Sequence, residues 1–230
     1  DPKIADAIMA ACDQIIAGEG HEFFVVDMLQ GGAGTSTNMN ANEVIANMAL
    51  RRIGKPRGDY ASINPNDHVN LSQSTNDVYP TAVRLTILRD CPSLLDSQIA
   101  LKAAFLNKAA EFDRIITVGR TQLMDAVPMR LGSEFRAFGV TVGEDVDRLK
   151  EFANLLREVN LGGTAIGTGI NTPGDYPATV IRHLSKVSGV DLVTAGDLIE
   201  ATSDMGAFVT FSGVLKRIAV KLSKICNDLR

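Results

Sequence analysis

The sequence predicts an all-α protein built on long helices, with a smaller and mostly helical N-terminal domain. Two observations predict the long helices: apolar residues recur three and four positions apart over residues 131–159 and again over residues 208–229. Such spacing places the apolar side chains on one face of a helix. A third observation is that no run of alternating apolar and polar residues indicates a sheet of several strands.

The predicted helix over residues 131–159 would be about 45 Å long at ~1.5 Å per residue, which is longer than a small domain is wide. It therefore requires partners of similar length. One predicted partner is the segment 208–229, whose steps of three and four follow the a and d positions of a heptad. A second is the segment 93–116, which follows Pro92. Together these helices predict a bundle.

Two shorter helices are predicted before the bundle, over residues 4–17 and 42–52, and Gly54 and Pro56 mark the end of the second one. A change of composition near residue 75 predicts a domain boundary. Residues 1–75 are then part of an N-terminal domain and residues 76–230 part of the central bundle. Because the last helix carries no stop signal before Arg230, we expect the C-terminal part of the protein to be absent from this sequence.

Composition narrows the class of partner. The 230 residues carry a formal net charge of only −4, so no basic surface is predicted that would hold nucleic acid or an anionic membrane. No apolar stretch is long enough to span a bilayer, and no leader pattern is found. The three cysteines are far apart and outside any C-x-x-C pattern, which predicts a reducing, cytoplasmic environment.

Three polar segments interrupt the helical pattern, each next to a predicted helix. Residues 31–40 read GGAGTSTNMN, residues 68–77 read HVNLSQSTND, and residues 119–128 read GRTQLMDAVP. Glycines in the first segment allow backbone N–H groups to approach an anion, and a helix N-terminus favours negative charge. A capped turn remains the alternative, since Ser, Thr and Asn are common N-caps. In the third segment, we expect Arg120 and Asp125 to pair with each other or with a neighbour.

These segments resemble the signature motifs of the aspartase/fumarase superfamily and occur in the order found there. The matching residues are Gly34-Thr35-x-x-Asn38-Met39-Asn40, Ser72-Gln73-Ser74-Thr75-Asn76-Asp77 and Gly119-Arg120-Thr121-Gln122, and residues 163–172 are similar to a fourth motif. Ala33, Thr75 and Gln122 stand at positions that resemble the aspartase branch rather than the fumarases. The resemblance therefore favours an ammonia-lyase acting on L-aspartate and forming fumarate, with fumarase or a non-catalytic superfamily member as alternatives.

The resemblance also implies how such a site works. Thr35, Ser74 and Thr75 would bind the β-carboxylate, and Asn76 and Thr75 would orient the amino group. The remaining site residues by resemblance are Thr121, which would contact the α-carboxylate, Gln122, which would position the substrate or the leaving amine, and Asn38 beside them.

No metal or cofactor is implied. The resemblance further implies a homotetramer whose active sites are shared between subunits. The catalytic base of the superfamily is a Ser in a Gly-Ser-Ser-x-Met-Pro-x-Lys-x-Asn pattern, which these 230 residues lack. We expect it after Arg230.

Overall fold

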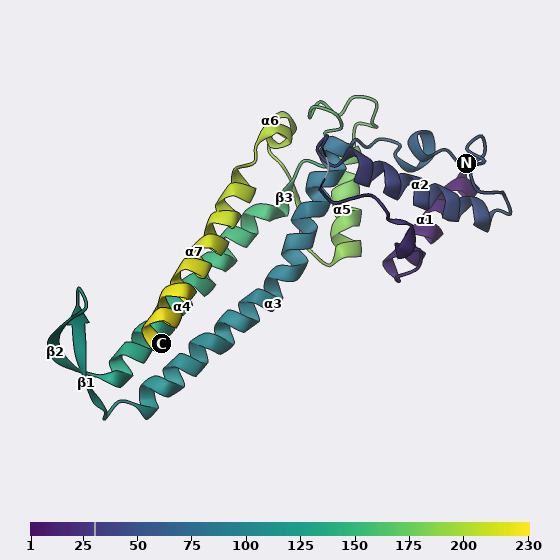
Figure 1. The fold of residues 1–230 in the computed structure, drawn as a ribbon. Coiled ribbons are helices and arrows are strands. Elements are labelled where there is room, and N and C mark those ends of the chain that lie inside the picture. The colour runs from purple at the N-terminus through teal and green to yellow at the C-terminus, as the bar shows by residue number, and fades with distance from the viewer. Residues whose placement is uncertain (30) are drawn as a thin grey trace. The chain divides into compact units, whose positions relative to one another are not determined.

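The computed structural model describes residues 1–29 and 31–230, and the chain divides into two compact units (Figure 1). Unit 1 contains Asp1–Val83 and Val159–Ser203, and unit 2 contains Arg84–Glu158 and Asp204–Arg230. Residues 159–203 therefore return to unit 1 after the first half of unit 2 is complete. The assignment of residues 1–75 and 76–230 to two domains of the whole protein stays a prediction.

Unit 1 is built on two packed helices, α1 (Pro2–Ile16) and α2 (Thr35–Arg52). The side chain of Asp1 caps α1 by accepting a hydrogen bond from the backbone N–H of Lys3, and a proline fits the first turn because its missing N–H would have no helical partner. Small residues let the two backbones approach closely. The buried cluster consists of Ala7, Ala11, Ala46, Ala49, Leu50 and Ile63.

The rest of unit 1 consists of short elements and the start of one long helix. The short elements are η1 (His21–Phe23), the π-helical turn η2 (Pro65–Val69), α5 (Tyr176–Ser188), β4 (Val193–Thr194) and α6 (Leu198–Ser203). Helix α3 (Thr75–Glu111) begins in unit 1. The backbone N–H of Ala195 donates to the carbonyl of Val159, so the residue at which the chain returns to unit 1 is held beside the end of β4.

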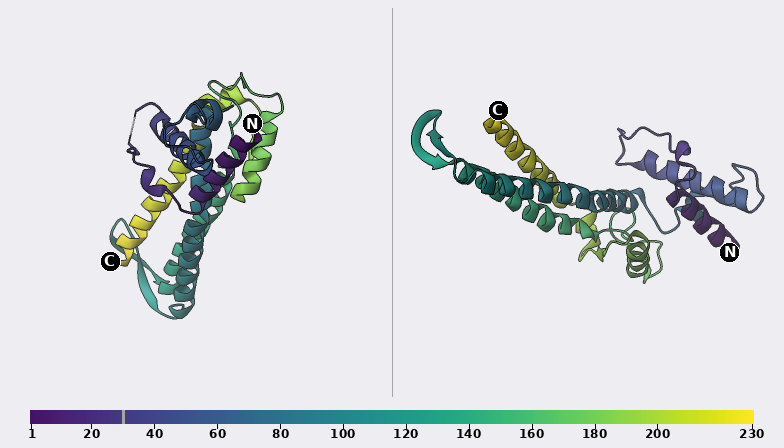
Figure 2. Two further views of the ribbon diagram at one scale, coloured as in Figure 1. Left: turned by 90° about the vertical axis from the view of Figure 1, so that its right-hand side faces the viewer. Right: turned by 90° about the horizontal axis from the view of Figure 1, so that it is seen from below.

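Unit 2 is a bundle of three long helices; in both views of Figure 2 the first two run along one another and the third, in yellow, is inclined to them. They are the larger part of α3, α4 (Leu131–Ala153) and α7 (Gly206–Leu229). One buried cluster joins Cys91, Leu149 and Phe211, which lie one on each helix. A second joins Phe105, Phe138 and Ile225 further along the same helices. The prediction of an all-α fold on long helices is confirmed.

Several predicted boundaries were wrong. Helix α2 begins at Thr35 rather than near residue 42, and α3 begins at Thr75 rather than after Pro92, so both polar segments end inside a helix. Helix α4 ends at Ala153, and a 3-10 turn η3 (Asn154–Arg157) and the extended β3 (Glu158–Val159) follow it.

The third polar segment is a hairpin rather than a loop. Strands β1 (Ile116–Thr121) and β2 (Met124–Arg130) pair antiparallel at one end of unit 2. Within residues 1–29 and 31–230, no helix is both long and apolar enough to cross a bilayer.

Candidate functional site

The candidate site is built around the first turn of α3. The hydroxyl oxygen of Ser74 accepts from the backbone N–H of Asn76 at 3.2 Å, and the carboxylate of Asp77 accepts from the backbone N–H of Ser74 at 2.9 Å. The arrangement is similar to a capping box, with the Ser74 hydroxyl bound at the second helical position instead of the third, and it satisfies helix-end donors that would otherwise lack partners. These hydrogen bonds fix the positions of the Ser74 and Thr75 side chains at the start of the helix. The helix N-terminus also places partial positive charge beside them.

Amide side chains of α2 reach the same turn. The Nδ2 of Asn38 donates to the hydroxyl oxygen of Thr75 at 3.0 Å and to Oδ1 of Asn70 at 3.3 Å. The Nδ2 of Asn42, one turn later, donates to the same Asn70 oxygen at 3.1 Å. Both helical amides are buried. Because the Thr75 oxygen accepts from Asn38, the hydroxyl proton is directed away from Asn38 and is available to a ligand.

The glycine segment before α2 packs directly on the start of α3. Gly34 has a φ of 88°, and a Cβ atom built there would lie 2.5 Å from the ring of Tyr79, so only glycine fits. Thr35 follows as the first residue of α2, and its hydroxyl donates to the carbonyl of Gly32 at 2.7 Å. The predicted carboxylate-binding residue Thr35 is therefore in the same unit as Thr75, and it directly follows a glycine that faces the Tyr79 ring of α3.

The fourth motif closes the site from another part of the chain. The Nδ2 of Asn76 donates to the carbonyl of Ala165 at 2.7 Å, and the Nδ2 of Asn160 donates to the carbonyl of Asn76 at 3.0 Å. An open cavity of about 470 Å³ lies between the two segments. Its lining includes Asn66, Asp67, Gln73, Ser74, Thr164 and Asn171. The buried hydroxyl of Thr164 has no hydrogen-bond partner among the described residues.

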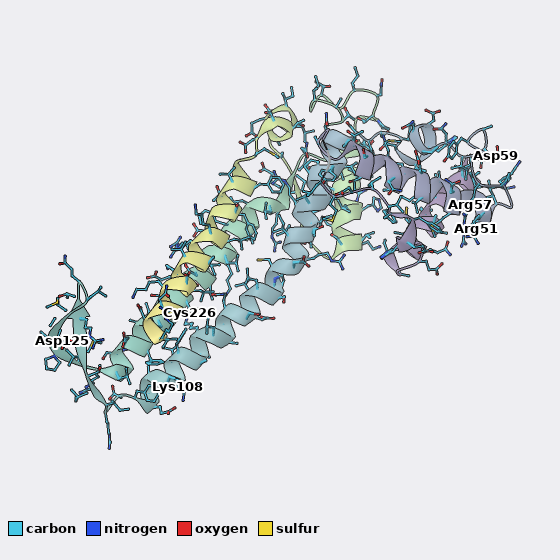
Figure 3. All side chains as sticks on the ribbon, viewed as in Figure 1. Arg51, Arg57, Asp59, Lys108, Asp125 and Cys226 are labelled. Atoms are coloured by element: carbon cyan, nitrogen blue, oxygen red, sulfur yellow. The ribbon has the colours of Figure 1, made fainter. Side chains whose placement is uncertain are left out.

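Thr121 and Gln122 are not part of this cluster. Thr121 ends β1, Gln122 begins the turn of the hairpin, and both are exposed residues of unit 2. The expected ion pair on this hairpin is confirmed, because Nε of Arg120 lies 3.0 Å from Oδ1 of Asp125, which Figure 3 labels. The five other predicted site residues lie together in unit 1. They are Thr35, Asn38, Ser74, Thr75 and Asn76.

The electrostatics of the site centre on Asp77, for which the sequence predicts no role. The residue is fully buried, and burial raises the pKa of its carboxyl above the usual value. Hydrogen bonds from the backbone N–H groups of Ser74, Thr164 and Gly162 oppose this shift. Burial, and then the charge of Asp77, also raise the pKa of Tyr176. The described residues contain no group of three or more side chains that could hold a metal ion.

Comparisons with known proteins agree with this architecture. Residues 1–230 match the lyase family. Two curated relatives are aspartate ammonia-lyases. This chain is 63% identical to the one from Pseudomonas fluorescens over 97% of this chain, and 54% identical to the one from Escherichia coli K12 over 100% of this chain. It spans about half the length of these relatives, 47% and 48% respectively.

Solved structures give the same result. A fumarate lyase:delta crystallin from Brucella melitensis, solved with cobalt, superimposes with a TM-score of 0.95 at 60% identity, and this chain covers 50% of it. A class II fumarase from Schistosoma mansoni superimposes with a TM-score of 0.90 at 32% identity, with 51% covered. The chain belongs to the lyase family, and the curated relatives it resembles are aspartate ammonia-lyases.

Proposed function

We propose that the protein containing this chain is an aspartate ammonia-lyase, which converts L-aspartate to fumarate and ammonia. The observation that carries the proposal is the cluster of hydroxyl and amide groups at the N-terminus of α3, where Asn38 donates to Thr75. The identity of 54–63% to aspartate ammonia-lyases, compared with 32% to a class II fumarase, favours this substrate.

The difficult step of this reaction is removal of the Cβ proton. The resulting carbanion spreads its charge into the neighbouring carboxylate, which then carries two negative charges as an aci-carboxylate. Preorganised donors that lie where this charge develops lower the barrier most. Ser74 and Thr75 are the donors we assign to the β-carboxylate, together with Thr35, whose hydroxyl has to turn from the carbonyl of Gly32 in order to donate to the substrate. The capping hydrogen bonds and the Asn38 hydrogen bond support this role for Ser74 and Thr75, because they hold these two residues before the substrate arrives.

Ammonia then leaves from Cα, and we assign Asn76 to the amino group. The Nδ2 of Asn76 donates to the backbone carbonyl of Ala165, which leaves the side-chain Oδ1 of Asn76 to accept from the substrate amine. Thr121 is assigned to the α-carboxylate and Gln122 to the substrate or the leaving amine. An amide does not titrate near neutral pH, so Gln122 would position groups rather than transfer protons.

The site as proposed needs other parts of the assembly. The hairpin that carries Thr121 and Gln122 exposes Leu123 at 95% and Met124 at 71%, which is expected of a surface that docks on another subunit. We propose a homotetramer in which such hairpins complete the sites of neighbouring chains. The serine base is proposed to come from the half of the protein that this chain does not span.

The test is performed on the full-length protein. Ammonia release from L-aspartate and hydration of fumarate are measured side by side, with deamination expected and hydration absent. Ser74→Ala and Thr75→Val are each expected to lower kcat by about 10²–10³-fold, the scale for loss of one oxyanion donor. Efficient hydration would instead assign the protein as a fumarase, and an unchanged kcat in folded variants would remove these residues from the mechanism.

A further inference from the structure

One buried carboxylate joins two segments of unit 1 that are far apart in the sequence. Oδ1 of Asp77 accepts from the backbone N–H of Ser74 at 2.9 Å. Its Oδ2 accepts from the backbone N–H of Gly162 at 3.1 Å and of Thr164 at 2.9 Å. Asp77 is fully buried, so these N–H groups take the place of water around the charge. The start of α3 and the turn at residues 162–164 are therefore held through one side chain.

The chemistry of this contact requires a carboxylate. Three N–H donors point at its two oxygens, and a carboxylate is the side chain that only accepts. An asparagine of the same shape would keep one accepting oxygen and turn an NH₂ group toward at least one donor. Hydrogen bonds to an ionised acceptor are also shorter and stronger than neutral ones.

The backbone of the facing turn is shaped to supply these donors. Gly162 has a φ of 97° and Thr164 a φ of 58°, both in the left-handed region that side chains disfavour. A Cβ atom at Gly162 would lie 2.8 Å from Pro177, so the turn is also closely packed. Backbone strain of this kind persists only where surrounding contacts fix it, and it is found near functional sites.

Hydrogen bonds between neutral groups reinforce the contact between the start of α3 and the segment that contains residues 162–164. The amide of Asn160 donates to the carbonyl of Asn76 and to the hydroxyl of Thr202, both at 3.0 Å. The amide of Asn76 donates back to Ala165. Asn76, the residue before Asp77, is therefore tied to this part of the chain as well, although only Asp77 contributes a charge to the contact.

We propose that Asp77 is a positioning residue, which sets the direction of the Ser74, Thr75 and Asn76 groups by holding the first turn of α3 against residues 162–164. This inference rests on the proposed function for the role of those three residues. Asp77 itself is assigned no contact with the substrate. Because a displacement of about 1 Å can cost about 10²-fold in rate, loss of this contact is expected to lower kcat while KM changes little.

The experiment replaces Asp77 in the full-length protein by the isosteric Asp77→Asn. Expected are a fall in kcat of about 10²-fold, a KM within about threefold of wild type, and faster amide hydrogen exchange at Gly162 and Thr164. The matched control is Asp145→Asn, because Asp145 is equally buried but pairs with Arg217 and Lys221 in unit 2. It is expected to lower stability and to keep the kcat of the folded enzyme.

A second variant keeps the test decisive if Asp77→Asn does not fold. Asn160→Ala removes the hydrogen bonds to Asn76 and Thr202 and leaves the Asp77 carboxylate with its three N–H donors. It is expected to lower kcat by about tenfold with KM again little changed. A kcat within about threefold of wild type in a folded Asp77→Asn would overturn the proposal, as would an equal loss in Asp145→Asn or unchanged exchange at Gly162 and Thr164. If Asp77→Asn does not fold, a wild-type kcat in Asn160→Ala overturns it. If wild type does not deaminate aspartate, the proposed function fails, while the exchange data still test the contact itself.

Discussion

The hydrogen bond from Asn38 to Thr75 offers the sharpest test of the donor cluster. In wild type, the amide donates to the Thr75 oxygen at 3.0 Å, which leaves the hydroxyl proton for the substrate. Asn38→Asp replaces the donor by a carboxylate that can only accept. The Thr75 hydroxyl is then expected to donate to this carboxylate and to be lost to the transition state. Loss of one such donor costs about 3–4 kcal/mol, or roughly 10²–10³-fold in kcat.

Asn42→Asp is the matched control, because Asn42 lies on the same helix, is also buried and donates to the same Asn70 oxygen without touching Thr75. Each substitution turns an acceptor toward Asn70, so each is expected to lower the free energy of unfolding by about 1–3 kcal/mol.

The assay measures kcat for ammonia release by the full-length variants, together with their urea unfolding midpoints. The kcat of Asn38→Asp is expected to fall well below that of Asn42→Asp. If the two variants have a similar kcat, the hydrogen bond from Asn38 does not prepare the Thr75 hydroxyl as a donor.

Three further predictions concern the fold of the chain. Gly34→Ala is expected to lower the free energy of unfolding by more than Gly18→Ala: both have positive φ, but a Cβ meets a ring at 2.5 Å at the first position and nothing within 4 Å at the second. Urea denaturation of the two variants measures the difference. Leu123→Gly is expected to stabilise the hairpin by about 1 kcal/mol, because φ at this position is 66°, and slower amide exchange in β1 and β2 would show it. Iodoacetamide at pH 8 is expected to modify the exposed Cys226, labelled in Figure 3, before the buried Cys91, since burial raises the pKa of the Cys91 thiol. Peptide mass mapping over time would contradict this if Cys91 reacts first.

The long helices could be predicted because their apolar spacing is a local property of the sequence. The ends were harder to predict. The apolar spacing predicts a helix as far as Val159, yet the backbone there is extended and its carbonyl accepts from the N–H of Ala195. The sequence predicts a helix start after Pro92, but α3 continues through this proline. Long-range packing of the apolar residues before and after this proline compensates for the one helical hydrogen bond it removes.

The hairpin could not be predicted from its turn residues. Its two central residues, Gln122 and Leu123, have φ values of 49° and 66°, as in a type I′ turn. Such turns normally carry Asn-Gly or Asp-Gly, and neither pair occurs here. Two non-glycine residues therefore stand at positive φ at the tip of the hairpin, at an energetic cost that other contacts of the protein offset. Strained residues of this kind occur more often at functional sites, and Gln122 is a predicted site residue.

The candidate site shows a similar division between what motifs reveal and what only the fold reveals. The resemblance predicts that Asn38 and Thr75 belong to one site, and their hydrogen bond shows that the two side chains are in contact. Asp77 stood inside the same motif without a role, because its partners Gly162 and Thr164 follow it by 85 and 87 positions. Those partners contribute backbone N–H groups, which every residue except proline possesses, so no side-chain pattern marks them. A carboxylate that serves a site through backbone contacts therefore becomes visible only when the fold brings the two segments together.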